Sequence, residues 1–395
     1  MQSRLLARRL LTAHGEVEYP VLTVEDGRIV HVEAGEANGS TETLTACFFD
    51  IHVHGACSYD LMAADAGEIA QVGRFLASRG VGHYLATTVT GPVDATLRAL
   101  ERLADAIEAG GAVGQDVALP VGVHLEGPFV SHAKRGVHPP ASILEPSVAL
   151  FDRFQEAARG HIRLMTMAPE LPGALELIAH AAAAGVRVSV GHSDATEAQA
   201  LAGVSAGAAS ATHAFNAMRA LNHREPGILG VVLDRDELYA EAICDGVHVH
   251  PSLIRLWLKA KGVEKAILVT DGMSATGMPD GMYTLGDLKV TVKDGVCLSD
   301  GTLAGSVLTM DVAVENLQRF TGSSLGVAVG LASRNPARML GMTELAELGP
   351  GSAANFNVYD AAGRRTGTIL NGRLLDAWKP ESKGLCEGAV VAGIL

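Results

Sequence analysis

The sequence contains few cysteines and few aromatic residues. Its cysteine count is 5, an odd number, and no two of them form a CxxC pair. This usage argues against a disulfide framework and favours a reduced, cytoplasmic protein. Aromatic residues make up only 4% of the chain, although 48% of all residues are hydrophobic. We therefore expect a large core that is built mainly from aliphatic side chains.

Positive charge is also scarce. The chain has 31 lysines and arginines against 44 aspartates and glutamates, which gives a formal net charge of −13. Nucleic-acid surfaces and polybasic membrane anchors need positive patches, so we expect neither kind of partner. A local basic pocket for a small anion remains open. The longest stretch without a charged residue, 198–218, contains Gln199, His213 and Asn216, and we do not expect it to span a membrane.

Short apolar segments alternate with amphipathic or alanine-rich segments through the middle of the chain. This alternation predicts parallel strands joined by helices, and eight strands favour a closed (β/α)8 TIM-type barrel over an open sheet. Helices are predicted at 66–79, 94–109, 172–184 and 251–261. The eight predicted strands are 48–54, 83–89, 121–126, 161–167, 187–192, 211–215, 239–245 and 266–271.

Both ends of the chain have the pattern of short strands joined by tight turns. Asp26-Gly27 divides one predicted hairpin near the start, and Asn371-Gly372 divides another near the end. These patterns predict a small β-sandwich domain formed by residues 1–47 and 346–395, and a catalytic barrel formed by residues 48–345. A further hairpin is predicted at 288–298, around Asp294-Gly295.

Polar residues that can bind metals follow several of the predicted barrel strands. Alternate residues of a strand face the same side, so His52 and His54 point together. Because the carboxyl ends of parallel barrel strands meet on one face, we expect such residues to converge there. The predicted set comprises His52, His54, Glu126, His192, His213 and Asp271.

Each of these residues has an ordinary structural explanation when it is taken alone. A histidine at a strand end is usually a hydrogen-bonded structural residue, and Asp271 is equally suited to cap the following helix. The structural explanation would, however, need the same coincidence at several equivalent strand ends. The complete set therefore favours a functional site.

Imidazole and carboxylate ligands suit a divalent metal such as Zn, Fe, Mn or Co. Glu126, His192 and His213 would supply three ligands and leave a position open, while His52 and His54 could hold a second ion with Glu126 as a bridge. A metal centre of this kind lowers the pKa of a bound water molecule towards ~7. Asp271 would then accept the proton of that water and pass it to the leaving group.

Seven motifs together resemble the amidohydrolase superfamily and, within it, the N-acetylglucosamine-6-phosphate deacetylases. Most other amidohydrolases have a bridging lysine where this chain has Glu126. The resemblance implies hydrolysis of the N-acetyl group of N-acetylglucosamine 6-phosphate to give glucosamine 6-phosphate and acetate. The motifs are HVHG (52–55), HLEGPF (124–129), GHSDAT (191–196), THAFNAM (212–218), DGVHVHP (245–251), VTDGM (269–273) and LAGS (303–306).

The resemblance also implies roles for individual residues. It makes Glu126, His192 and His213 the main metal ligands and Asp271 the catalytic base and acid. It implies substrate-binding positions at Val137, His138, Asn216, Ala217, Arg224, His248, Leu303, Ala304 and Gly305.

Arg224 would pair with the phosphate, and in a homodimer or larger assembly it could do so across a subunit boundary. By composition alone, Lys134 and Arg135 are an equally plausible basic pair.

Three questions stay open at the level of sequence. Some relatives lack the HxH histidines and use one metal, whereas this chain retains both histidines, which favours a site for two ions. A deacetylase of N-acetylgalactosamine 6-phosphate, or another amidohydrolase-type amide hydrolase, would use the same metal site. A non-catalytic scaffold is a remote alternative, because all six predicted ligand and base positions are retained.

Overall fold

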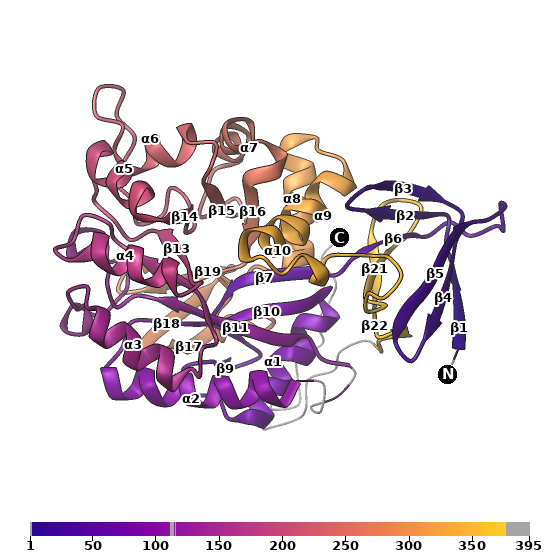
Figure 1. Ribbon diagram of the computed structural model, residues 1–395, viewed down its shortest axis with the longest axis horizontal. Coiled ribbons are helices and arrows are strands. Elements are labelled where there is room, and N and C mark those ends of the chain that lie inside the picture. The colour runs from indigo at the N-terminus through magenta and orange to yellow at the C-terminus, as the bar shows by residue number, and fades with distance from the viewer. Residues whose placement is uncertain (1, 111–113, 115, 377–395) are drawn as a thin grey trace.

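An eight-stranded parallel sheet, rolled into a barrel, forms the centre of the protein in a computed structural model that describes residues 2–110, 114 and 116–376 (Figure 1). Each strand pairs in parallel with the next one along the chain, which confirms the predicted barrel. The barrel strands are β7 (Phe48–Val53), β10 (Val81–Thr88), β11 (Leu119–Glu126), β12 (Ile162–Met167), β13 (Arg187–Val190), β14 (Ala208–Ala211), β15 (Tyr239–Ile243) and β16 (Ala266–Val269).

The first and last barrel strands meet through the residues that follow them. The backbone N–H of His54 donates to the carbonyl oxygen of Gly272 at 2.7 Å, and that of Asp271 donates to the carbonyl oxygen of His52 at 2.9 Å. The barrel is therefore closed at the carboxyl ends of its strands, the face on which TIM barrels carry their active sites.

Helices surround the outside of the barrel strands (Figure 1). Aspartate, serine or threonine caps the N-terminus of several of them. Asp65, for example, accepts a hydrogen bond from the backbone of Glu68 before the first helix. The helices are α1 (Ala66–Ser78), α2 (Val93–Ala109), α3 (Val148–Ala157), α4 (Ala174–Ala183), α5 (Glu197–Ala206), α6 (Gly227–Asp234), α7 (Pro251–Lys265), α8 (Met310–Thr321), α9 (Leu325–Ala332) and α10 (Arg334–Leu340).

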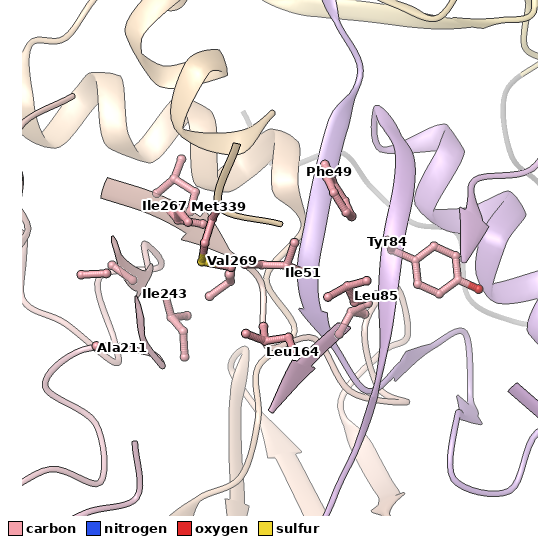
Figure 2. Packing of buried hydrophobic residues seen from close by; sticks show 14 of the residues in the cluster. Phe49, Ile51, Tyr84, Leu85, Leu164, Ala211, Ile243, Ile267, Val269 and Met339 are labelled. Carbon is pink, nitrogen blue, oxygen red and sulfur yellow. The ribbon is translucent and has the colours of Figure 1, made fainter. Parts of the chain in front are cut away.

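The core between the barrel and its helices is largely aliphatic, as the composition predicts. Ile51, Leu85, Leu164 and Ile267 are fully buried, each on a different barrel strand, and Figure 2 shows them in one packed cluster. Burial of such side chains contributes about 25 cal/mol per Å² of apolar surface, so this cluster stabilises the barrel.

Both ends of the described chain contribute to a small β domain beside the barrel (Figure 1). Its sheets have the orders β1-β4-β5 and β23-β22-β21-β6-β2-β3. Leu22 of the first sheet and Phe356 of the second share one buried cluster. The strands are β1 (Gln2–Leu6), β2 (Arg9–Thr12), β3 (Gly15–Glu18), β4 (Pro20–Glu25), β5 (Arg28–Ala34), β6 (Thr43–Ala46), β21 (Phe356–Tyr359), β22 (Arg365–Leu370) and β23 (Arg373–Leu374).

The two predicted terminal hairpins are confirmed. Asp26 and Gly27 have φ of 47° and 81°, and Asn371 and Gly372 have φ of 50° and 77°. Positive φ at both turn residues is the geometry of a tight hairpin turn, which asparagine, aspartate and glycine tolerate. The predicted boundaries of the two domains stay a prediction, and residues 377–395 of the predicted β domain lie outside the described residues.

The structure contradicts one predicted strand and confirms one predicted hairpin. A strand over 211–215 is wrong, because β14 ends at Ala211 and the φ of His213 is 27°, which an extended strand does not allow. The hairpin at 288–298 is confirmed and belongs to a larger four-stranded antiparallel sheet. Its strands are β17 (Gly281–Leu285), β18 (Leu288–Lys293), β19 (Val296–Ser299) and β20 (Thr302–Leu303).

The remaining regular elements are short. A two-stranded hairpin of β8 (Gly55–Ala56) and β9 (Tyr59–Asp60) follows the first barrel strand, and 3-10 turns occur at His132–Lys134, Pro140–Ser142 and Thr343–Leu345. Among the described residues, no helix combines the length and the apolar character that a bilayer span requires.

Candidate active site

The six residues predicted to form the site converge at the carboxyl ends of five barrel strands. Glu126 is the last residue of β11, whereas His192, His213 and Asp271 follow β13, β14 and β16. These last three have φ of 47°, 27° and 52°. A positive φ costs a non-glycine residue about 1–3 kcal/mol, and it turns each side chain into the space above the barrel.

Three ligand atoms form the first group that could hold a metal. Oε1 of Glu126 lies 3.2 Å from Nε2 of His192 and 3.1 Å from Nε2 of His213, and the two Nε2 atoms are 3.1 Å apart. All three side chains are buried. The predicted convergence of these residues is therefore present in the fold.

A second group lies directly beside the first. Nε2 of His52 is 3.3 Å from Nε2 of His54 and 3.4 Å from Oδ1 of Asp271, and His54 is 3.2 Å from the same oxygen. Glu126 lies between the groups, because its Oε1 is 3.5 Å from His52 and its Oε2 is 3.4 Å from His54. One carboxylate is thus positioned to serve both groups.

The donor atoms of both groups fit a divalent cation. Ligands at ~2.0–2.1 Å from a tetrahedral ion lie about 3.3 Å from one another, close to the spacing found here. Nδ1 of His192 lies 3.1 Å from the carbonyl oxygen of Lys134. A carbonyl only accepts, so Nδ1 carries the hydrogen and Nε2 presents a lone pair to the group. Nitrogen and oxygen donors without cysteine suit an open, catalytic site.

The charges of the site compensate one another. Burial by itself would lower the pKa of His54, but the neighbouring carboxylates of Asp271 and Glu126 raise it to about 9. Burial would raise the pKa of Asp271, and His52 and His54 instead hold it below its usual range. The carboxylates of this cluster therefore remain ionised and surrounded by nitrogen atoms.

His138 lies next to these groups, but the pKa of its ring is shifted in the opposite direction from that of His54. Burial, together with the nearby His192, lowers its pKa to about 3, so its ring is neutral near pH 7. Its Nδ1 is 2.6 Å from the hydroxyl of Thr90, and its Nε2 is 3.7 Å from Oε2 of Glu126. A neutral imidazole that faces the ligand groups is suited to hydrogen bonding with a substrate.

A cavity of about 380 Å³ opens over both groups. Its volume is in the range of small-molecule sites. His54, Glu126, His192, His213 and Asp271 contribute to its wall, while His52 lies behind them with no exposed surface. The predicted substrate-binding residues that line it are Val137, His138, Asn216, Ala217, His248, Leu303 and Gly305.

His248 belongs to a hydrogen-bonded pair at the cavity wall. Its Nδ1 is 2.6 Å from Oδ2 of Asp245. Burial would lower the pKa of His248, but this carboxylate raises it above its usual value. His248 can therefore present a donor, with part of a positive charge, to an anionic or hydroxylated ligand.

Ala304 and Arg224, also predicted to bind substrate, are not among the residues that line this cavity. Ala304 is buried in a small hydrophobic cluster beneath the four-stranded sheet. Arg224 is exposed in the loop before α6, where its backbone N–H donates to Oδ1 of Asn222 at 2.9 Å. Lys134, by contrast, contributes to the cavity wall, with Nζ 3.9 Å from Oδ1 of Asp194.

Glu241 is a site residue that the sequence analysis missed. It lies inside β15, has no exposed surface, and approaches the ring of His52. The available signal was a carboxylate within the otherwise apolar segment YAEAI, since buried glutamates are rare unless they are paired.

Comparisons with known proteins identify a family and similar relatives for this chain. The model of the amidohydrolase family matches residues 43–379. The chain is 38% identical to the N-acetylgalactosamine-6-phosphate deacetylase of Escherichia coli O157:H7, over 90% of this chain and 95% of the relative. It is 35% identical to the N-acetylglucosamine-6-phosphate deacetylase of Lysinibacillus sphaericus, over 92% of this chain and 95% of the relative.

A solved structure is similar over nearly the whole fold. It is a variant of the N-acetyl-D-glucosamine-6-phosphate deacetylase of Mycobacterium smegmatis in complex with N-acetyl-D-glucosamine 6-phosphate. The TM-score is 0.89 at 34% sequence identity, and the similarity covers 94% of this chain and 99% of that one.

Proposed function

The chain belongs to the amidohydrolase family, and we propose that it is a metal-dependent deacetylase of N-acetylglucosamine 6-phosphate. The products are glucosamine 6-phosphate and acetate. The observation that carries the proposal is the convergence of Glu126, His192 and His213 beside Asp271 in one cavity of about 380 Å³. This arrangement combines a cation site with a base at the place where a small amide can enter.

The two ligand groups would hold one or two divalent ions of Zn, Fe, Mn or Co. Glu126, His192 and His213 form the first site, and His52, His54 and Asp271 form the second, with Glu126 between them. A bound cation would polarise the acetyl carbonyl and make hydroxide available near neutral pH.

Asp271 is the proton carrier of the reaction. Its carboxylate lines the cavity and stays ionised beside His52 and His54, so it can accept a proton from the attacking water. After water adds to the carbonyl carbon, the C–N bond breaks and the amine leaves with the proton that Asp271 returns. Acetate and the free amino sugar remain.

His138 orients the acetyl group. The hydroxyl of Thr90 lies 2.6 Å from Nδ1, and we propose that it donates there, so that Nε2 carries the ring hydrogen at the cavity. A neutral donor there can bond the acetyl oxygen as negative charge develops on it, without adding a charge that would compete with the cation.

The sugar and its phosphate bind against other residues of the cavity wall. His248 and the backbone of Asn216 and Ala217 contribute polar groups there, and Leu303 and Gly305 limit the space. Arg224 is not among the residues that line the cavity of its own chain. We propose that Arg224 of a second copy of the chain pairs with the phosphate, and that this cytoplasmic enzyme is therefore a homodimer or larger assembly.

An acetate-release assay tests the proposed function. Protein stripped with a chelator should release no acetate from N-acetylglucosamine 6-phosphate, and Zn, Fe, Mn or Co added singly should restore release. Metal-loaded protein that releases no acetate would refute the proposal.

A second candidate substrate is N-acetylgalactosamine 6-phosphate, because a deacetylase of that epimer is 38% identical to this chain. The metal groups contact the acetamide in both cases and do not distinguish the epimers. Values of kcat/KM for the two sugar phosphates, measured on one preparation, decide between them. A higher value for the galactosamine epimer would replace our first choice.

A further inference from the structure

Glu241 links one residue from each ligand group. Its Oε2 lies 3.3 Å from Nδ1 of His52, and it accepts a hydrogen bond from the backbone N–H of His213 at 3.2 Å. The side chain has no exposed surface and projects from β15, between the strands that carry the two groups. A single buried carboxylate oxygen therefore supports both groups from below.

The charge of Glu241 has very little compensation. Within the part of the chain that the structure describes, its ion-pair partner is the ring of His52, and no lysine or arginine pairs with it. Its other oxygen, Oε1, has no hydrogen-bond partner among the described residues. A buried carboxylate in this situation is costly, so its presence demands a compensating positive charge nearby.

The contact also fixes how His52 presents its ring. A carboxylate only accepts hydrogen bonds, so Nδ1 of His52 carries the hydrogen. In the neutral ring, Nε2 then keeps a lone pair, and that atom faces His54 at 3.3 Å and Asp271 at 3.4 Å. A carboxylate behind a histidine in this way orients the ring and strengthens it as a metal ligand.

We propose that Glu241 is the positioning residue that enables His52, His54 and Asp271 to hold a second divalent cation. The proposal rests on the metal-dependent function above. The first group depends less on Glu241, because the contact there is to the backbone of His213 and not to its ring. Loss of Glu241 should therefore remove the second ion and leave the first.

The test measures bound metal directly. Wild-type protein, Glu241→Leu and Glu241→Gln are saturated with zinc and desalted, and bound zinc per chain is determined by elemental analysis. Competition with a chromophoric chelator then gives the affinity of the weaker ion. We expect two ions per wild-type chain and one per Glu241→Leu chain. The weaker ion should bind about 10- to 100-fold less tightly when the carboxylate is removed.

Glu241→Gln should lie between these two proteins. Its amide oxygen can still accept from His52 and from the backbone of His213, but it lacks the negative charge. Asn335→Ala is a matched control: Asn335 is also fully buried, and its amide donates to the carbonyl oxygens of Val263 and Ala266 away from the ligand groups. This control should lose thermal stability and keep both ions.

Several outcomes would overturn the inference. The inference is wrong if the Glu241→Leu protein binds two ions with wild-type affinity. It is also wrong if the wild-type protein binds only one ion at saturating zinc. If Glu241→Leu does not fold, unchanged affinity in Glu241→Gln would overturn the inference instead. Acetate release is measured separately: its absence from wild-type protein with two bound ions counts against the proposed function and not against the role of Glu241.

Discussion

Nε2 of His54 and Oδ1 of Asp271 lie 3.2 Å apart, although they follow the first and the last strands of the barrel. The backbone also joins these strands, because the N–H of Asp271 donates to the carbonyl oxygen of His52. The carbonyl oxygen of Asp271 in turn accepts a hydrogen bond from the N–H of Ser306 at 2.8 Å. Closure of the barrel therefore places the proposed base against the proposed metal ligands. The position of the Asp271 carboxylate is a property of the whole barrel and not of a mobile loop.

Asp271→Asn should remove proton transfer while it preserves the size of the side chain and the first cation site, to which Asp271 does not belong. We expect kcat for the acetylated sugar phosphate to fall by about 10²–10⁴-fold, the usual contribution of a positioned acid or base. Substrate binding should change little, because the amide has the same size. Steady-state kinetics and an equilibrium binding measurement check the two parts, and an unchanged kcat would contradict the assigned role.

The two ligand groups should respond differently to the loss of one histidine. We expect His54→Ala to lose one zinc ion per chain and His192→Ala to lose acetate release altogether, because His192 belongs to the group that we propose as the first cation site, with Glu126 and His213. Elemental analysis and an acetate assay on the same preparations test this. Two ions retained in His54→Ala would show that His54 is not a ligand.

Much of this architecture could be predicted from the sequence. Apolar segments of strand length alternate with helical ones, and this alternation located seven of the eight barrel strands; the exception is β14. Since the barrel topology brings the strand ends together, residues as distant as His52 and Asp271 could be assigned to one site. The terminal hairpins were equally predictable, because their turn residues need positive φ.

Other features depend on tertiary contacts that sequence periodicity does not carry. The end of β14 was misplaced because His213 turns out of the strand with φ of 27°, a conformation set by its surroundings. Glu241 was missed because its proposed role comes from a contact with His52, which lies on another strand of the barrel far away in the sequence. The position of Arg224 outside the cavity wall was not visible either, since loop geometry has no periodic signal.

Arg224→Ala should weaken binding of the phosphorylated sugar specifically. A charge-assisted hydrogen bond to phosphate contributes about 1.5–3 kcal/mol, so KM should rise about 10- to 100-fold. The KM of the unphosphorylated sugar should change little. The effect should also require assembled protein, because Arg224 does not line the cavity of its own chain.

Lys134→Ala is the matched comparison, because Lys134 does line that cavity. Both variants are assayed with the phosphorylated and the unphosphorylated sugar, and sedimentation gives their oligomeric state. If Lys134→Ala raises KM for the phosphorylated sugar and Arg224→Ala does not, the phosphate contact belongs to Lys134.

The variant Phe49→Ala should lower the free energy of unfolding, because it removes part of the buried packing behind the site. Phe49 is buried on β7, three residues before His52, and its ring meets the ring of His83 edge-on with centroids 6.5 Å apart. Removal of a buried phenylalanine side chain typically costs about 3–5 kcal/mol of unfolding free energy.

Leu374→Ala is the control, because Leu374 is 68% exposed and its loss should change stability by less than about 0.5 kcal/mol. Urea unfolding of both variants, with zinc held constant, measures the difference. Equal midpoints would mean that β7 is not held in place by this packing.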